Sequence, residues 1–137
     1  LADRILDLMT PWQRMLDEGM TTCAEVFGPS RSDCHAWGCS PNVFFLTSVL
    51  GIEPAEPGFR SVRIEPHLGP LSAACGSMPT PAGTIQVAIR PMHARVELPA
   101  GVGGCFVWEG RQETLRGGRN ELQLSLSDCR NRRSSRW

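Results

Sequence analysis

The apolar positions near the start of the chain recur at helical spacing. Residues 2–9 interleave apolar and charged side chains, which predicts a short amphipathic helix. Thr10 and Pro11 then have the form of a helix start, with Thr10 as N-cap and Pro11 as the first helical residue. A second helix is predicted over residues 11–18, and Gly19 ends it. The first helix contributes the apolar residues Ile5, Leu6 and Leu8, and the second is expected to bury Trp12, Met15 and Leu16, which share one face.

Residues 20–36 show no period, and a strongly apolar helix is predicted after them. Ser40 and Pro41 repeat the start signal, and the predicted helix runs over 41–50 until Gly51 ends it. Its apolar residues are Val43, Phe44, Phe45, Leu46, Val49 and Leu50. A stripe this wide predicts packing on two sides. We therefore expect it to pack against further helices upstream of Leu1, where the chain begins within a helical pattern.

The pattern changes to β after a predicted linker at 52–58, which contains two prolines and a glycine. Short apolar runs follow, separated by Gly and Pro turns such as 79–83. The predicted strands are 59–66, 71–78, 84–89, 94–98, 104–110, 111–116 and 120–126. Ile85, Val87 and Ile89 alternate with polar residues and should point inward. Many short strands with frequent turns favour an antiparallel β-sandwich.

The charges exclude some classes of partner. The 137 residues contain 14 acidic and 14 basic side chains, and all the basic ones are arginines. A balanced charge provides no long-range attraction to nucleic acid, and no apolar run approaches the roughly 18 residues that span a bilayer. Residues 129–137 are polar and arginine-rich, and we expect disorder there. No signal region is recognisable, so both a cytoplasmic and an exported protein remain open.

Six cysteines are scattered along the chain. Most stand where a small apolar residue would fit, which favours reduced, structural thiols over a disulfide framework. Cys23, Cys34, His35 and Cys39 invite a zinc interpretation, but no C-x-x-C pair is present. We therefore predict neither a metal nor another cofactor. His67 and His93 are expected on the surface.

The candidate chemistry lies in the aperiodic segment after the second helix. It brings Glu25, Arg31, Asp33, His35 and Trp37 into thirteen residues, and loops between rigid elements often carry functional groups. By residue type alone, Glu25 is a solvated loop acid and His35 a satisfied structural histidine. Arg31 and Asp33 could pair with each other or fix the loop. Trp37 could stack on a ligand, although packing under the loop is the commoner use.

Five ordered motifs resemble the C-terminal end of bacterial family-78 glycoside hydrolases, the α-L-rhamnosidases. They are TT-x-x-E at 21–25, SRSDCHAW at 30–37, LGI-x-P at 50–54, PGF-x-x-V-x-I-x-P at 57–66 and PTP-x-G at 79–83. Two features differ from the family's usual pattern. Ala24 stands where an aromatic residue is usual, and the strand pair around 89–98 is shorter.

The resemblance implies an α+β architecture. Residues 1–53 would be the last helices of an (α/α)6 toroid with an active-site loop, residues 54–128 a β-sandwich, and residues 129–137 a tail. It also implies an inverting hydrolase of terminal α-L-rhamnose, with Glu25 as general base and His35 in the sugar pocket. From the residues themselves, we take Trp37 as a candidate substrate contact and Arg31 and Asp33 as candidates to orient Glu25. The general acid would lie upstream, so this chain alone should be inactive.

A non-catalytic role is the alternative. The sandwich could bind carbohydrate or could only support the helical part. A carbohydrate-binding module usually presents aromatic side chains on one strand face, and Phe106 and Trp108 are the nearby candidates. The sequence leaves open which face these two side chains occupy.

Overall fold

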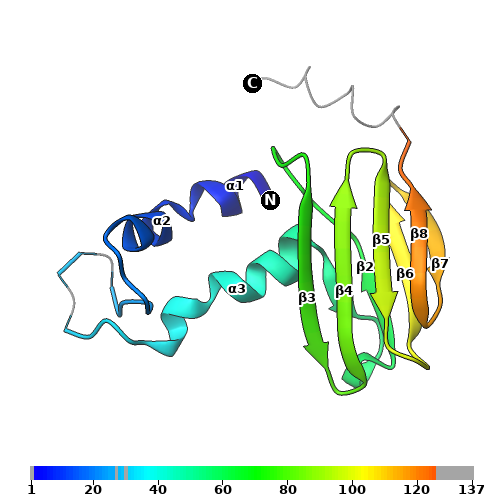
Figure 1. The fold of residues 1–137 in the computed structure, drawn as a ribbon, viewed down its shortest axis with the longest axis horizontal. Coiled ribbons are helices and arrows are strands. Elements are labelled where there is room, and N and C mark those ends of the chain that lie inside the picture. The colour runs from blue at the N-terminus through cyan, green and yellow to red at the C-terminus, as the bar shows by residue number, and fades with distance from the viewer. Residues whose placement is uncertain (1, 27, 30, 126–137) are drawn as a thin grey trace.

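The computed structural model describes residues 2–26, 28, 29 and 31–125 (Figure 1). Its N-terminal part is helical and leads into two β-sheets. The helical elements are α1 (Ala2–Asp7), α2 (Thr10–Asp17), the 3-10 turn η1 (Ala36–Cys39), α3 (Pro41–Phe44) and the π-helical turn η2 (Phe45–Val49). The predicted tail at 129–137 lies outside the described residues. None of the described helices combines the length and hydropathy needed to cross a membrane.

The helix boundaries follow most of the predicted signals. Helix α1 ends at Asp7, and Thr10 is the first residue of α2 rather than its cap. The Thr10 hydroxyl donates to the Asp7 carbonyl at 3.0 Å, so it bonds backward and is not available as a cap. Gly19, with φ of 77°, terminates α2 as predicted. Pro41 begins α3 as predicted, but the Ser40 side chain makes no capping hydrogen bond.

Burial in the helical part is narrower than the apolar pattern predicts. Met15 is buried, but Leu16 is 67% exposed and Leu8 is 63% exposed. Val43 and Phe44 of α3 are also exposed. The expectation that Leu16 is buried is therefore wrong within the described residues, because no described element covers that face of α2.

The end of the third helix packs into the sandwich. Val49 and Leu50 are buried, and Leu50 lies so close to Gly76 of the first long strand that a Cβ there would come within 2.7 Å of it. Gly51 then turns the chain with φ of 65°. Its carbonyl accepts a hydrogen bond from the Glu65 amide at 2.9 Å. The junction between helix and sandwich is therefore a close backbone contact rather than a free linker.

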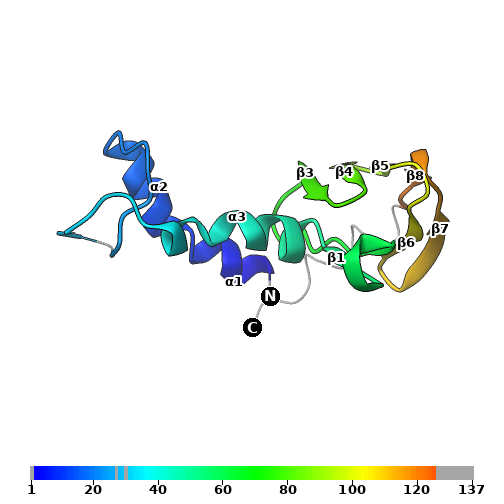
Figure 2. The ribbon, with the colours of Figure 1, turned by 90° about the horizontal axis from the view of Figure 1, so that it is seen from below.

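Two four-stranded sheets lie face to face (Figure 2). One has the order β1-β2-β6-β7 and the other β3-β4-β5-β8. The strands are β1 (Ile52–Pro54), β2 (Ser61–Ile64), β3 (Ala74–Thr80), β4 (Gly83–Arg90), β5 (His93–Leu98), β6 (Gly103–Trp108), β7 (Arg111–Leu115) and β8 (Gly118–Gln123). A 3-10 turn, η3 (Pro57–Phe59), connects β1 to β2.

Two sequence expectations about the strands are wrong. The predicted linker at 52–58 begins with β1, which pairs with β2 and buries Ile52 completely. The sandwich is also not purely antiparallel, since β2 pairs with β6 in parallel, with Ser61 opposite Gly103. Gly104 permits this pairing, because a Cβ there would lie 1.9 Å from the Val62 carbonyl oxygen.

The remaining strand boundaries shift by a few residues. Strand β3 starts three residues later than predicted and continues through Thr80, so the predicted turn at 79–83 shrinks to Pro81 and Ala82. The short strand pair around 89–98 forms a regular hairpin, with Arg90 opposite His93.

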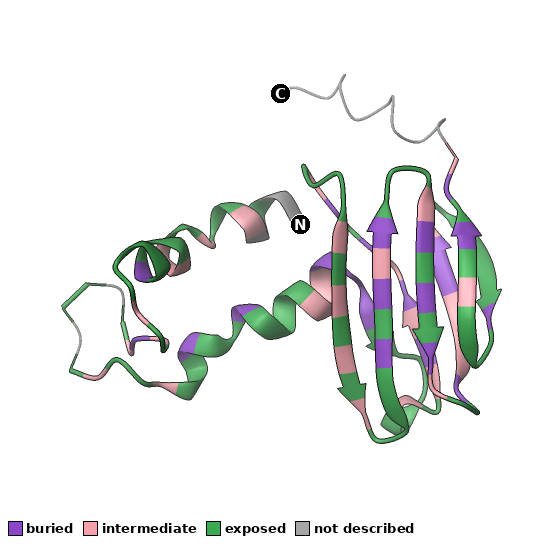
Figure 3. Cartoon of the chain, in the orientation of Figure 1, coloured by how far each residue is buried: buried purple, intermediate pink, exposed green. Residues whose placement is uncertain are grey.

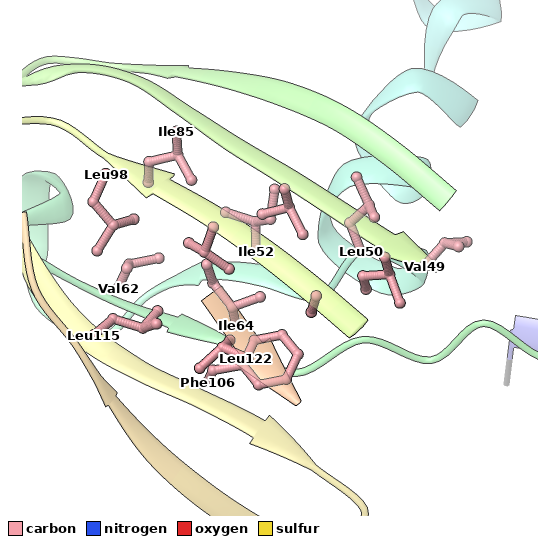
Figure 4. Packing of buried hydrophobic residues seen from close by; sticks show 14 of the residues in the cluster. Val49, Leu50, Ile52, Val62, Ile64, Ile85, Leu98, Phe106, Leu115 and Leu122 are labelled. Atoms are coloured by element: carbon pink, nitrogen blue, oxygen red, sulfur yellow. The ribbon is translucent and has the colours of Figure 1, made fainter. Parts of the chain in front are cut away.

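The inner faces of the two sheets form one apolar core. Ile85, Val87 and Ile89 point inward as predicted, and burial alternates along β4 and β5 (Figure 3). Phe106 is among the largest fully buried side chains, and Val49 and Leu50 join the same cluster at its helical end (Figure 4). This shared core links the position of the helical part to the sandwich.

Candidate functional site

The loop between α2 and η1 is held together by hydrogen bonds across its base. The Glu25 amide donates to the Ser32 carbonyl at 3.0 Å, and the His35 amide donates to the Cys23 carbonyl at 2.8 Å. The Thr22 hydroxyl donates to the Asp33 carbonyl. Residues 22–25 and 32–35 therefore run side by side as a loop clasp. It lies at the end of the helical part farthest from the sandwich (Figure 1).

Glu25 is tied to Arg31 by two hydrogen bonds. Arg31 Nη2 donates to Glu25 Oε1 at 2.6 Å, and Nε donates to Oε2 at 3.2 Å. The Glu25 side chain is only 15% exposed, whereas that of Arg31 is 88% exposed. A fork of this kind fixes the plane of a carboxylate. Glu25 is thus not a freely solvated loop acid.

Asp33 contributes through its backbone. Its carbonyl binds the Thr22 hydroxyl, whereas Arg31 forms its ion pair with Glu25. Of the two roles open to Asp33 in the sequence, the described contacts favour fixing the loop over pairing with Arg31.

His35 and Trp37 form a ring pair that is joined to the backbone of Glu25. Their rings are 4.2 Å apart between centroids and are inclined by 46°. The indole N–H of Trp37 donates to the Glu25 carbonyl at 3.2 Å, yet the residue is 62% exposed. Packing under the loop, the commoner use of a tryptophan, is therefore not what the structure shows. Both the amide and the carbonyl of Glu25 are held, and a broad indole face stays open beside it.

The His35 ring contains an unusual nitrogen. Its Nδ1 is buried and has no hydrogen-bond partner among the described residues. Buried polar atoms usually have a partner, and an unsatisfied one costs about 1–3 kcal/mol. This ring is therefore not the satisfied structural histidine that its residue type alone suggests.

Helix α2 contacts the segment after the loop through a hydrogen bond that the sequence does not predict. Trp12 Nε1 donates to the Gly38 carbonyl at 2.6 Å. Gly38 is packed so tightly that a Cβ there would lie 2.8 Å from both the Cys23 Cβ and the Ala24 carbonyl oxygen. The sequence pattern assigns Trp12 only to an apolar stripe, and 26 residues separate the two partners.

A groove of about 490 Å³ lies on the helical part. Apolar side chains such as Trp12, Met15 and Phe45 form much of its wall, and Thr22 and Cys23 of the loop clasp also line it. Glu25 is not one of its lining residues. The groove is therefore an apolar surface next to the candidate site rather than the site itself.

The described cysteines near the loop are free thiols and do not form a metal-binding cluster. A hydrogen bond with Cys39, followed by burial and nearby Cys34, raises the pKa of the Cys23 thiol. Within the described residues no cluster of three or more His, Cys, Asp or Glu side chains could hold a metal ion. The described cysteines, all free, are Cys23, Cys34, Cys39, Cys75 and Cys105.

Solved structures share this fold of helices followed by a sandwich. The alfa-L-rhamnosidase from Aspergillus terreus superposes with a TM-score of 0.70 over 85% of this chain at 23% identity. The Streptomyces avermitilis alpha-L-rhamnosidase, solved in complex with L-rhamnose, gives 0.67 over 83% at 15% identity. The fold of this chain is therefore one that also occurs within these two larger chains.

The sequence relationship is specific for the sandwich. Residues 51–121, more than half of the chain, match the family described as bacterial alpha-L-rhamnosidase C-terminal domain. The chain belongs to this family. An alpha-L-rhamnosidase from Alteromonas sp. (strain LOR) is 32% identical over 80 residues, or 58% of the chain.

The matched region is a small part of those proteins. The alignment covers 9% of the Alteromonas protein, and the superpositions cover 16% and 15% of the Aspergillus and Streptomyces chains. Membership of this domain family therefore does not by itself establish that the chain has the activity of those longer proteins.

Proposed function

We propose that the chain acts within a longer α-L-rhamnosidase, where Glu25 is the general base of an inverting hydrolysis. The observation that carries this proposal is the loop clasp. It holds a forked carboxylate, and the indole that donates to the Glu25 carbonyl packs against the imidazole of His35, which has an unsatisfied nitrogen. The chain's family and the printed activity of its relatives support rhamnosides as the substrates.

An inverting glycosidase needs two carboxyl groups about 6.5–9.5 Å apart, one to protonate the leaving oxygen and one to deprotonate a water molecule. Glu25 takes the second role. Each carboxylate oxygen has two acceptor positions, and Arg31 uses one on each oxygen of Glu25. The remaining position on either oxygen can accept the proton of the attacking water. Arg31 is then a positioning residue.

His35 and Trp37 are proposed to bind the sugar. The exposed Trp37 ring offers an apolar face beside Glu25, and the His35 ring next to it offers a hydrogen bond to a hydroxyl. Asp33 acts only indirectly, by fixing the segment that carries His35. The proton donor to the leaving group must come from another part of the enzyme.

We further propose that the helical elements complete an (α/α)6 toroid. The exposed apolar side chains on α2 and α3, among them Leu16, Val43 and Phe44, support this role. Exposed apolar surface of this kind is typical of an interface. Helices from the same enzyme would cover it.

The proposed role of Glu25 is tested in a protein of full rhamnosidase length that contains these 137 residues. Glu25→Gln keeps the shape of the side chain but removes its basicity, so kcat should fall at least about 10²–10⁴-fold with KM little changed. Glu18→Gln, an exposed acid at the end of α2, is the matched control and should leave kcat unchanged. Near-normal turnover by Glu25→Gln would remove Glu25 from the mechanism.

The alternative, a carbohydrate-binding sandwich with an aromatic platform, is not favoured by the strand faces. Phe106 is buried in the core, and Trp108 packs against the same cluster with its ring stacked 6.5 Å from that of Phe106. Neither side chain forms an open platform. Titration of the whole chain with a neutral rhamnoside should show no saturable binding at the sandwich. The whole chain is needed because Val49 and Leu50 belong to the sandwich core.

A further inference from the structure

A small hollow lies on the outer face of the β3-β4-β5-β8 sheet. Its volume is about 150 Å³. The residues that line it, called the arginine hollow below, are Ala88, Arg90, His93, Arg95, Arg119 and Glu121. The residues between them on β4 and β5 point into the core, so the hollow is on the solvent side of the sheet. It is separate from the loop clasp, which lies at the opposite end of the molecule (Figure 1).

The strand register explains the shape of the hollow. Ala88 lies opposite Arg95, which lies opposite Glu121, and Arg90 lies opposite His93 in the next row. Ala88 carries only a methyl group, whereas its neighbours on the same face are long. The short Ala88 side chain therefore forms the bottom of the hollow, and the longer side chains of Arg90 and Arg95 form its sides.

The charge in the arginine hollow is not balanced. Three arginines and one carboxylate line it. Glu121 is engaged by Arg119 and by His93, whose Nε2 lies 2.8 Å from a Glu121 oxygen. Among the described residues, neither Arg90 nor Arg95 takes part in an ion pair. Arg95 lies opposite Glu121 and acts electrostatically on its carboxylate, but Arg119 and His93 already engage that carboxylate. Arg90 has no ion-pair partner among the described residues.

The other acidic residue near the hollow on this face of the sheet does not neutralise Arg90 and Arg95. Glu97 also lies on the outer face, but its register partners are Gln86 and Arg119. It is not one of the residues that line the hollow. Since the whole chain has a formal net charge of zero, the positive potential is local. Such a site suits a small anion better than a polyanion, which needs an extended field.

The size and chemistry of the hollow indicate one kind of ligand. A volume of about 150 Å³ corresponds to about five liquid water molecules, enough for one oxyanion group and the ring atoms next to it. A guanidinium fork binds such oxyanions in its plane. The residues lining the hollow include no Phe, Trp or Tyr on which nucleic-acid bases could stack.

We propose that the arginine hollow binds the carboxylate or sulfate group of an acidic sugar, with Arg90 and Arg95 as its ligands. The choice of a sugar as the carrier of the anion rests on the proposed rhamnosidase function. The sandwich would then hold an acidic unit of a glycan chain away from the reacting bond. This gives the enzyme a preference for charged rhamnose-containing glycans.

Isothermal titration of the 137-residue chain at low salt tests the proposal. The probes are glucuronate, glucose 6-sulfate, inorganic sulfate, neutral rhamnose and a short single-stranded DNA. We expect Kd near 1 mM for the two acidic sugars, weakening as salt is added. Any weak binding of neutral rhamnose at the loop clasp should depend neither on salt nor on Arg90 and Arg95. Equal affinity for inorganic sulfate and glucose 6-sulfate would overturn the sugar assignment. Tighter binding of the DNA at the same residues would overturn it too.

Variants locate the site. Arg90→Gln combined with Arg95→Gln should weaken glucuronate binding about tenfold or more, since two charged hydrogen bonds are lost. Ala88→Leu should do the same by filling the hollow while keeping both charges. Arg111→Gln, an exposed arginine on β7 of the other sheet, is the control and should bind as the parent chain does. Unchanged binding in both the double variant and Ala88→Leu would overturn the proposal.

This result is separable from the role of Glu25. Glu25→Gln should leave glucuronate binding by the chain intact, because Glu25 lies on the loop clasp. Failure of the arginine hollow to bind acidic sugars would leave the base assignment standing, and failure of Glu25 as base would leave a measurable anion site.

Discussion

Replacement of Gly51 by alanine tests whether the helical part and the sandwich are joined by a close backbone contact. Gly51 has φ of 65°, in the left-handed region, where a residue with a Cβ is destabilised by about 1–2 kcal/mol. A Cβ at this position would also lie 1.9 Å from the Glu65 carbonyl oxygen and 2.2 Å from its carbon. Both of these atoms are backbone, so no side-chain rotation relieves the overlap.

The magnitude follows from the contacts that must open. Ordinary contact begins near 3.4 Å, so the two segments must separate by about 1.5 Å. That movement breaks the hydrogen bond from the Glu65 amide to the Gly51 carbonyl. It also strains the neighbouring hydrogen bond from the His67 amide to the Val49 carbonyl; both are 2.9 Å long. At about 1 kcal/mol for each bond, plus the backbone term, Gly51→Ala should lower the free energy of unfolding by about 3–4 kcal/mol.

Thermal unfolding followed by circular dichroism measures this loss, and Gly101→Ala separates its two causes. Gly101 has φ of 81°, but nothing lies within 4 Å of a Cβ built there. Its substitution should therefore cost only the backbone term. For a domain of this size we expect Tm to fall by about 10 °C in Gly51→Ala and by about 3–6 °C in Gly101→Ala. Equal shifts in the two variants would refute the close contact at the junction.

Three further outcomes are expected. Phe106→Ala should destabilise the sandwich by about 3–5 kcal/mol in urea unfolding, and a loss below about 1 kcal/mol would show that this side chain is not in the core. Iodoacetamide at pH 8 should alkylate Cys23 more slowly than the exposed Cys34, because the raised pKa of Cys23 leaves less of it as thiolate. Faster labelling of Cys23 would contradict its hydrogen bond with Cys39. A hydrogen bond from Arg119 lowers the pKa of Glu121 below its usual 4.5, so this carboxylate adds stability above pH 4.5 that is lost as pH falls through its folded pKa. Glu121→Gln should therefore flatten the decline in stability between pH 6 and pH 3, and a parallel decline in both proteins would contradict this.

Much of the sandwich can be predicted from the sequence because alternation is a local signal. Ile85, Val87 and Ile89 point inward as their spacing requires. Strand β1 escapes prediction because it has only three residues and one of them is proline. The parallel pairing of β2 with β6 also has no local signal, since about forty residues separate the two strands and only the packed sheet brings them together.

The candidate site shows the same limit. The motif around Glu25 is visible in the sequence, but the partner of Arg31 is not, since Asp33 is closer along the chain than Glu25. The hydrogen bonds of the loop clasp decide that Arg31 meets Glu25. The arginine hollow likewise depends on the pairing of β5 with β8, which brings Glu121 beside Arg95.

Chemical rescue by azide tests the central claim, that Glu25 deprotonates the attacking water, most directly. In a protein of full rhamnosidase length that contains this chain, Glu25→Ala removes the base and opens space where the water would lie. Azide is already an anion and needs no base, so it should restore turnover of an aryl α-L-rhamnoside and yield the β-L-rhamnosyl azide, with inverted configuration. Glu25→Ala that turns over normally without azide, or an azide product of retained configuration, would contradict the assignment.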